Sequence, residues 1–382
     1  MPEKKTQHAI HQRIVGLDMI RAVAILLVLY GHGALLLPVS FQSKYYSYMP
    51  PIDGVSLFFV LSGFLIGGIL LKIIDTTDLT RADLLDFWIR RWFRTLPNYF
   101  LVLFLLVAYR WAVFHDTKGF SWEFLLFVQN FAWPHPEYFA EAWSLSIEEW
   151  FYLLFPLLYF ILHKGLKSRA KSFIYSVIFF LTAPLLARML KFGLGLGSQD
   201  FDSIYRKIVV FRLDSLMYGI IAAYLYRYKR QVWTKYKYVC LLLSAILLLI
   251  LDFNAIKWQK LYPPLYFNLE SVTVLLLMPF FSELKTTGLY LADKFFTGVS
   301  LLSYALYLVN LAMMKNMVIP TIHNQIGWRF AGAETTYIAD TITFWIGSFV
   351  IAWLIYYFFE RHMTKLRDRI HISAASKSKT AV

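Results

Sequence analysis

Apolar runs long enough to cross a membrane alternate with shorter polar segments along nearly the whole chain. A helix of about 20 apolar residues spans the roughly 30 Å hydrocarbon core of a bilayer. Such runs fall at residues 14–37, 54–72, 98–114, 143–162, 172–190, 208–226, 238–252, 267–283, 297–319 and 339–360. The pattern predicts an all-α, polytopic integral membrane protein with about ten transmembrane helices, of which the seventh and eighth are short. We expect a single membrane domain over residues 1–382 and no appended soluble domain.

Two longer connecting segments carry patterns of their own. Residues 73–97 place apolar residues at helical spacing beside basic ones, which predicts an interfacial helix that leads into the third span. Residues 115–142 contain Trp122, Trp133, Pro134 and Pro136. This segment either dips back into the outer membrane boundary or lies on it.

Composition agrees with this class. Hydrophobic residues make up 58% of the 382 residues and charged residues 16%, which argues against a soluble globular protein. The net charge of +14 indicates basic cytoplasmic loops rather than a nucleic-acid partner. An even number of spans puts both termini on one side, and most Lys and Arg then lie on the side of the termini, so we expect both to be cytoplasmic. The apolar run near the N-terminus is too long for a secretory signal and is interpreted as a retained span.

The first span carries charged and ionisable residues that lipid alone does not explain. His32 follows Arg21 by eleven positions, so on a helix the two side chains point in directions about 20° apart, about 16 Å apart along the axis. Asp18 lies near the same stripe. A charge inside a bilayer is costly unless it is paired or faces a polar cavity, so this helix is predicted to line a polar path. His32 is either a structural group or a proton carrier.

Two further groups lie at the ends of spans. Arg91 and Arg94 are three residues apart before the third span and serve either as positive-inside anchors or as a site for phosphate groups. Ser144, Glu148 and Tyr152 share one helix face at the start of the fourth span. Glu148 is either part of a helix cap or a carboxylate directed at the cavity of His32.

Isolated polar residues in later spans allow a structural or a functional interpretation. Arg212 and Asp214 are two residues apart, so on a helix each should pair with a different neighbouring helix. Asn310 fits a helix–helix hydrogen bond better than a catalyst. Cys240 is interpreted as a small apolar residue, since a single cysteine forms no intramolecular disulfide.

Several of these segments together resemble the membrane-bound acyltransferase 3 family, whose members O-acylate bacterial surface polysaccharides. The resemblance is carried, in chain order, by Arg21 and His32, by Phe58 to Ile66, by Arg91, Arg94, Pro97 and Tyr99, by Trp143 to Tyr152, by Arg212 and Asp214, by Ser303 to Leu308, and by Phe359, Glu360 and Arg361. It covers essentially the full length. The chain departs from the family pattern at Ser56, usually acidic, at Asn310, commonly His, and at His362, usually Pro.

The resemblance implies transfer of an acyl group, most simply acetyl, from acyl-CoA (acetyl-CoA) to a carbohydrate hydroxyl, in the bacterial inner membrane and without a metal or a permanently bound cofactor. We expect His32, Arg21 and Glu148 to be catalytic, with His32 as base or acyl carrier and Glu148 orienting it or relaying protons. Substrate and donor binding is expected from Arg91, Arg94, Asp18, Arg212, Asp214, Ser144 and Tyr152. The donor would enter from the cytoplasm and the carbohydrate acceptor from outside, with membrane lipid as a further partner. O-antigen, exopolysaccharide, peptidoglycan and a small glycosylated metabolite all remain open as acceptors.

A transporter or exporter of a lipid-linked or small carbohydrate is the competing prediction, since it would also need a polar stripe and intramembrane charges. The spans show no inverted repeat or paired broken helices of the kind that transporters often carry. A non-catalytic membrane scaffold would leave Arg21 and His32 unexplained.

Overall fold

The computed structural model describes residues 13–46, 48, 50, 52–76, 79–195, 201–261, 263–326 and 333–367. Within these ranges the regular secondary structure is entirely helical. The elements are α1 (Val15–Ala34), α2 (Val39–Tyr46), α3 (Gly54–Thr76), α4 (Arg81–Phe114), α5 (Glu123–Leu126), α6 (Ala142–Leu166), α7 (Arg169–Gly193), η1 (Asp202–Arg206), η2 (Val209–Phe211), α8 (Leu213–Tyr228), α9 (Arg230–Lys235), α10 (Lys237–Leu261), α11 (Pro263–Phe281), α12 (Tyr290–Val309), η3 (Asn310–Val318), α13 (Ile319–Thr321), η4 (Ile322–Ile326), α14 (Ala333–Ile355), η5 (Tyr356–Glu360) and α15 (Arg361–Arg367). Here η2 is a 3₁₀-helix and the other η elements are π-helices.

The prediction of an all-α, polytopic membrane protein is confirmed. Among the described residues, 8 helices are long and apolar enough to cross a membrane. One predicted span is shorter, because α8 has 16 residues. The helix α10 has 25 residues, and its predicted span at 238–252 falls in the apolar stretch Lys237–Leu251. The predicted interfacial segment and third span form one 34-residue helix, α4, which starts at a Thr80–Asp83 capping box and passes through Pro97.

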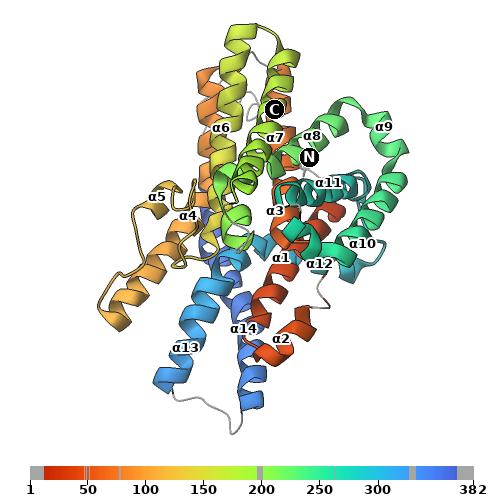
Figure 1. The fold of residues 1–382 in the computed structure, drawn as a ribbon. Helices are drawn as coiled ribbons and strands as arrows, with labels where there is room; N and C mark the ends of the chain where they lie inside the picture. The colour runs from red at the N-terminus through yellow and green to blue at the C-terminus, as the bar shows by residue number, and fades with distance from the viewer. Residues whose placement is uncertain are drawn as a thin grey trace, which may run out of the picture.

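The helices pack as a bundle around α3, with α1 beside it (Figure 1). In that view α6 and α7 extend from one end and α13 and α14 from the other. The helices α3 and α8 approach closely at two glycines. A Cβ atom on Gly63 would lie 2.0 Å from the Leu216 carbonyl oxygen, and a Cβ atom on Gly219 would lie 2.1 Å from the Val60 carbonyl oxygen. Backbones therefore meet at small residues, as is common between membrane helices.

The segment that contains α5 is folded into the protein. The Tyr99 hydroxyl donates to the Phe124 carbonyl at 2.9 Å, and the Trp150 indole donates to the Phe127 carbonyl at 2.9 Å. Phe124 and Phe139 are fully buried. The segment therefore packs against α4 and α6, and whether it dips into the outer membrane boundary or lies on it stays a prediction.

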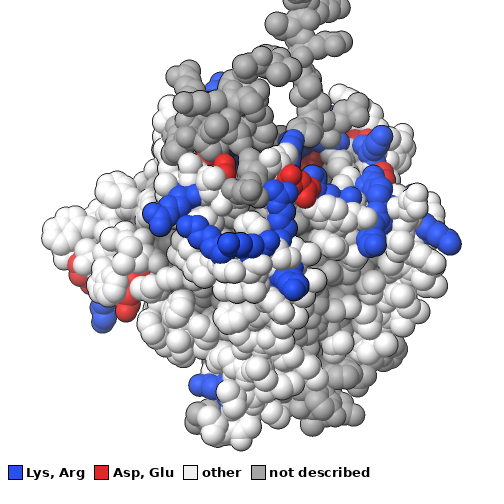
Figure 2. Space-filling view, turned by 90° about the horizontal axis from the view of Figure 1, so that it is seen from above, with Lys and Arg blue, Asp and Glu red and all other residues white. Residues whose placement is uncertain are grey.

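Basic side chains gather on the face at which α6 ends and α7 begins (Figure 2). Exposed residues here include Lys164 and Lys167 at the end of α6 and Arg169 and Lys171 at the start of α7. The positive-inside tendency expects such a face to be cytoplasmic. By the same orientation Arg21 lies nearer the cytoplasm and His32 nearer the outside, which stays a prediction.

Candidate active site

The polar stripe of α1 is continuous, because α1 runs unbroken through Asp18, Arg21 and His32. Asp18 is buried and accepts hydrogen bonds from Arg13 Nη2 at 2.7 Å and from the Ser300 hydroxyl at 2.7 Å. Arg21 Nη1 lies 3.9 Å from Asp18 and donates to Ser300 Oγ at 3.3 Å. Asp18 and Ser300 of α12 thus hold the Arg21 guanidinium at one end of the stripe.

A second arginine lies close to this end. Arg91 Nη2 donates to Glu148 Oε2 at 3.2 Å and to the Tyr152 hydroxyl at 2.7 Å, and its guanidinium covers the Tyr152 ring at 4.1 Å from the centroid. Tyr152 donates to Glu148 at 2.5 Å and also contacts the Ser62 hydroxyl. The charges of Arg91 and Glu148 act on Arg21. We call Arg21, Ser62, Arg91, Glu148 and Tyr152 the Arg91 cluster.

The surroundings of the Arg91 cluster contain more polar groups. Glu149 is buried and accepts from the Thr95 hydroxyl at 2.8 Å, while Tyr304 donates to the Thr95 carbonyl at 2.7 Å. Arg94 is exposed one turn after Arg91, and its charge acts on Glu360. The predicted pair of Arg91 and Arg94 therefore combines a buried guanidinium with an exposed one.

His32 lies at the other end of α1 and bonds to Asn310. The Asn310 amide nitrogen donates to the carbonyl oxygens of Leu306 at 2.9 Å and Tyr307 at 2.8 Å, so its orientation is fixed. Its side-chain oxygen is then the atom that faces His32 Nδ1. An amide oxygen only accepts, so Nδ1 carries the proton and Nε2 keeps its lone pair. Asn310 therefore holds neutral His32 in the tautomer whose Nε2 can accept a proton.

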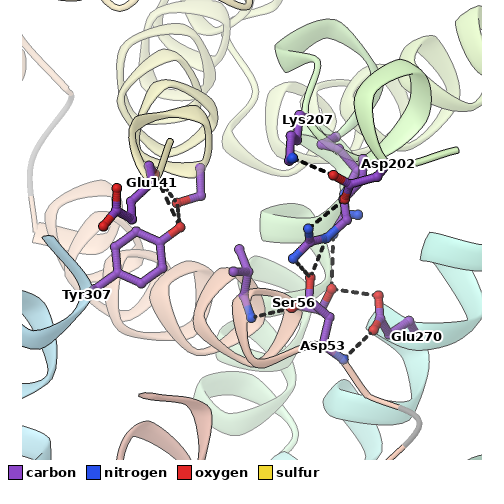
Figure 3. A network of polar contacts seen from close by, with 11 residues as sticks. Asp53, Ser56, Glu141, Asp202, Lys207, Glu270 and Tyr307 are labelled. Carbon is purple, nitrogen blue, oxygen red and sulfur yellow. Dashed lines mark hydrogen bonds and ion pairs between the residues drawn. The ribbon is translucent and has the colours of Figure 1, made fainter. Parts of the chain in front are cut away.

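Asn310 also begins the π-helix η3. The carboxylate of Glu141 accepts from the backbone N–H groups of Leu311 and Ala312, each at 2.8 Å, at this change of helix type. The Tyr307 hydroxyl bonds to Ser144 Oγ at 2.6 Å and donates to the Glu141 carbonyl at 3.2 Å. The start of α6 therefore supports the helix that presents Asn310, and Ser144 belongs to this end of the site (Figure 3).

The expected meeting of Glu148 and His32 is not what the structure shows. Among the described side chains no hydrogen bond joins the two, since Glu148 bonds to Arg91 and Tyr152 while His32 bonds to Asn310. Glu148 is seven residues, about 10 Å, further along α6 than Glu141. It therefore lies at the level of Arg91, while Glu141 lies at the level of His32.

Arg212 and Asp214 pair with different helices, as the sequence predicts. Asp214 forms a fully buried ion pair with Arg188 of α7 at 2.6 Å. Arg212 donates to Ser56 Oγ of α3 at 3.0 Å, and Ser56 donates to Glu270 Oε2 of α11 at 2.6 Å. Neither Arg212 nor Asp214 bonds to a member of the Arg91 cluster in the described part of the chain.

Five polar residues near these groups were missed by the sequence analysis: Asp53, Ser62, Glu141, Arg206 and Glu270. Each lies in an otherwise apolar span or beside the end of one, which is the signal that could have found them. Their partners could not be read from the chain. No set of three or more His, Cys, Asp or Glu side chains that could hold a metal ion occurs in the searched, described residues.

Comparison with known proteins identifies a family. The family model described as an acyltransferase domain matches residues 14–357. A Bacillus subtilis protein named "Putative peptidoglycan O-acetyltransferase YrhL" is 33% identical over 184 residues, which are 44% of this chain and 26% of that protein. A peptidoglycan O-acetyltransferase of Listeria monocytogenes is 29% identical over 190 residues, 43% of this chain and 27% of its own length. The chain thus matches about a quarter of these relatives. No solved structure matches it.

Proposed function

Because the chain belongs to the acyltransferase family whose model covers residues 14–357, we propose that it is a membrane O-acyltransferase. In this proposal it moves an acyl group, most simply acetyl, from a coenzyme A thioester to a hydroxyl of an extracytoplasmic carbohydrate. The observation that carries the proposal is His32, held by Asn310 with Nε2 free to accept a proton at one end of a stripe whose other end is the Arg91 cluster.

The Arg91 cluster is the proposed site for the phosphate groups of the donor. Arginine forks bind phosphate oxygens well, and three guanidinium groups, those of Arg21, Arg91 and Arg94, lie at this end. The buried Nε of Arg91 has no hydrogen-bond partner in the protein, so it could donate to a ligand. Glu148 and Tyr152 hold Arg91 in place, which gives Glu148 a positioning role.

His32 is the proposed general base. Its Nε2 would take the proton of the acceptor hydroxyl while the hydroxyl oxygen attacks the thioester carbonyl carbon. The carbon–sulfur bond then breaks, and the imidazolium returns the proton to the leaving thiolate, so the enzyme ends unchanged. The donor's arm would lie along the stretch of about 16 Å between Arg21 and His32 on α1.

The names of the relatives support a glycan acceptor. Both bacterial relatives are named for O-acetylation of peptidoglycan. We place this chain in the bacterial cytoplasmic membrane, which its 8 described spanning-length helices support. The acceptor in this proposal is a carbohydrate outside that membrane.

A labelled donor tests the proposal. The purified chain in detergent is given acetyl-CoA with a radioactive acetyl group and a pentamer of N-acetylglucosamine, and label in the sugar is counted. We expect His32→Ala to abolish transfer and His115→Ala, at an exposed loop histidine, to leave it unchanged. Transfer by His32→Ala at the wild-type rate would refute the assigned role.

A further inference from the structure

A charged pair, Asp53 and Arg206, lies against Trp143 at the start of α6 and has no part in the proposed reaction. Asp53, just before α3, accepts a hydrogen bond from Arg206 Nε at 2.9 Å, and Arg206 Nη2 lies 2.9 Å from the same carboxylate oxygen. Arg206 Nη1 also donates to Asp202 at 2.7 Å (Figure 3). The Arg206 guanidinium lies 4.7 Å from the centre of the Trp143 ring. The pair thus ties the start of α3 to η1.

A short series of contacts links this pair to His32, and the pair is partly open to solvent. The Arg206 guanidinium packs over the ring of Trp143, and the next residue, Ser144, bonds to the Tyr307 hydroxyl. The Tyr307 carbonyl accepts from Asn310, and Asn310 bonds to His32. The side chains of Arg206 and Asp53 are 26% and 21% exposed, whereas the neighbouring Arg212 is fully buried. Solvent can therefore reach the Asp53–Arg206 pair.

Three buried residues, Glu270, Ser56 and Arg212, hold the backbone at Asp53 in place. The Glu270 carboxylate accepts from the Asp53 backbone N–H at 2.7 Å and from the Ser56 hydroxyl at 2.6 Å. Arg212 donates to Ser56 Oγ at 3.0 Å and lies 3.7 Å from the centre of the Phe267 ring. The Nε and Nη1 atoms of Arg212 are buried without a partner in the protein. Arg212, Ser56 and Glu270 therefore fix the backbone from which Asp53 extends.

We propose that Asp53 and Arg206 form the acceptor subsite and bind adjacent hydroxyls of a pyranose ring, so that another hydroxyl of that ring reaches His32 Nε2. A carboxylate accepts from sugar hydroxyls and a guanidinium donates to them, so the pair offers both halves of a hydroxyl-binding site. The subsite rests on the proposed acyl transfer and assigns its sugar-binding residues.

Acceptor kinetics test this subsite in the intact purified chain. The probes are acetyl-CoA and the N-acetylglucosamine pentamer. We expect Arg206→Lys and Asp53→Asn each to raise KM for the pentamer about tenfold or more, in line with the loss of a charged hydrogen bond. Arg206→Lys keeps the positive charge but loses the forked N–H donors of the guanidinium. KM for acetyl-CoA should not change. This split between the two KM values is the readout that a merely structural role would not give.

A second ion pair in the outer segment serves as the matched control. Arg110 Nε lies 2.6 Å from Asp116, and these side chains are 30% and 43% exposed. Arg110→Lys and Asp116→Asn should leave both KM values unchanged. An unchanged pentamer KM in Arg206→Lys and Asp53→Asn, or an equal loss of affinity for both substrates, would overturn the subsite alone. No acetyl transfer by the wild-type chain would contradict the proposed function as well.

Discussion

Replacing Asn310 by leucine should lower kcat while the protein remains folded. The side-chain oxygen of Asn310 faces His32 Nδ1, so Asn310→Leu leaves the Nδ1–H group without an acceptor. An unpaired buried donor costs about 1–3 kcal/mol. At about 1.4 kcal/mol per factor of ten, this corresponds to a loss of about 5- to 150-fold in kcat if the transition state bears the full cost. In the other tautomer His32 would offer a proton at Nε2 and could not accept one.

Asn310→His is the matched variant, since an imidazole nitrogen can also accept from His32 Nδ1–H. It should keep most of the activity that the leucine variant loses. The assay is initial-rate transfer from acetyl-CoA to the N-acetylglucosamine pentamer, with ¹⁵N NMR of labelled histidine to report which ring nitrogen is protonated. A kcat for Asn310→Leu within twofold of wild type, with Nδ1 of His32 still protonated, would show that Asn310 does not fix the tautomer of His32.

Three further predictions concern the bundle and the outer segment. Asp214→Asn leaves the buried guanidinium of Arg188 without a compensating charge, so the unfolding free energy should fall by about 3–5 kcal/mol and the midpoint of thermal unfolding should fall with it. An unchanged midpoint together with a raised KM for acetyl-CoA would instead assign Asp214 to donor binding. Burial lowers the pKa of His135 to about 4. Below about pH 6.5 the unfolded chain therefore binds more protons than the folded chain. The free energy of unfolding should fall by at most about 3 kcal/mol as the pH drops to about 4. His135→Gln should flatten this slope in thermal unfolding, and a slope identical to wild type would contradict it. Glu270→Gln should raise KM for the pentamer, and adding Ser56→Asp should lower this KM again, because a carboxylate returns beside the buried Arg212. A KM for the pentamer that is higher in the double variant than in Glu270→Gln would contradict the role assigned to Glu270.

The sequence predicts the spans and the stripe of α1 because both depend on local periodicity. Lipid requires long apolar helices, and two costly side chains eleven positions apart share a helix face whatever surrounds them. The helix limits are less predictable. The third span is predicted at residues 98–114, but the helix α4 begins at Arg81 and continues through Pro97.

The partners of the stripe could not be predicted, because they come from distant parts of the chain. Asn310 lies 278 residues from His32, and the Ser56–Glu270 hydrogen bond spans 214 residues. Ser56 illustrates the difficulty. A serine at a position that is usually acidic in the resembling family suggests a lost carboxylate, whereas the structure supplies one from α11. The change to a π-helix at Asn310 leaves no mark in the hydrophobic pattern, so Glu141 could not be assigned to it.

In the proposed reaction, one chain binds the donor from its basic face and acetylates a sugar on the opposite face. The most direct measurement uses proteoliposomes with acetyl-CoA sealed inside and the N-acetylglucosamine pentamer outside, followed by mass spectrometry of the pentamer. We predict that the external pentamer gains acetyl groups with the wild-type chain and none with His32→Ala. Acetylation only when acetyl-CoA and the pentamer share one compartment, or equal acetylation by His32→Ala, would contradict the account.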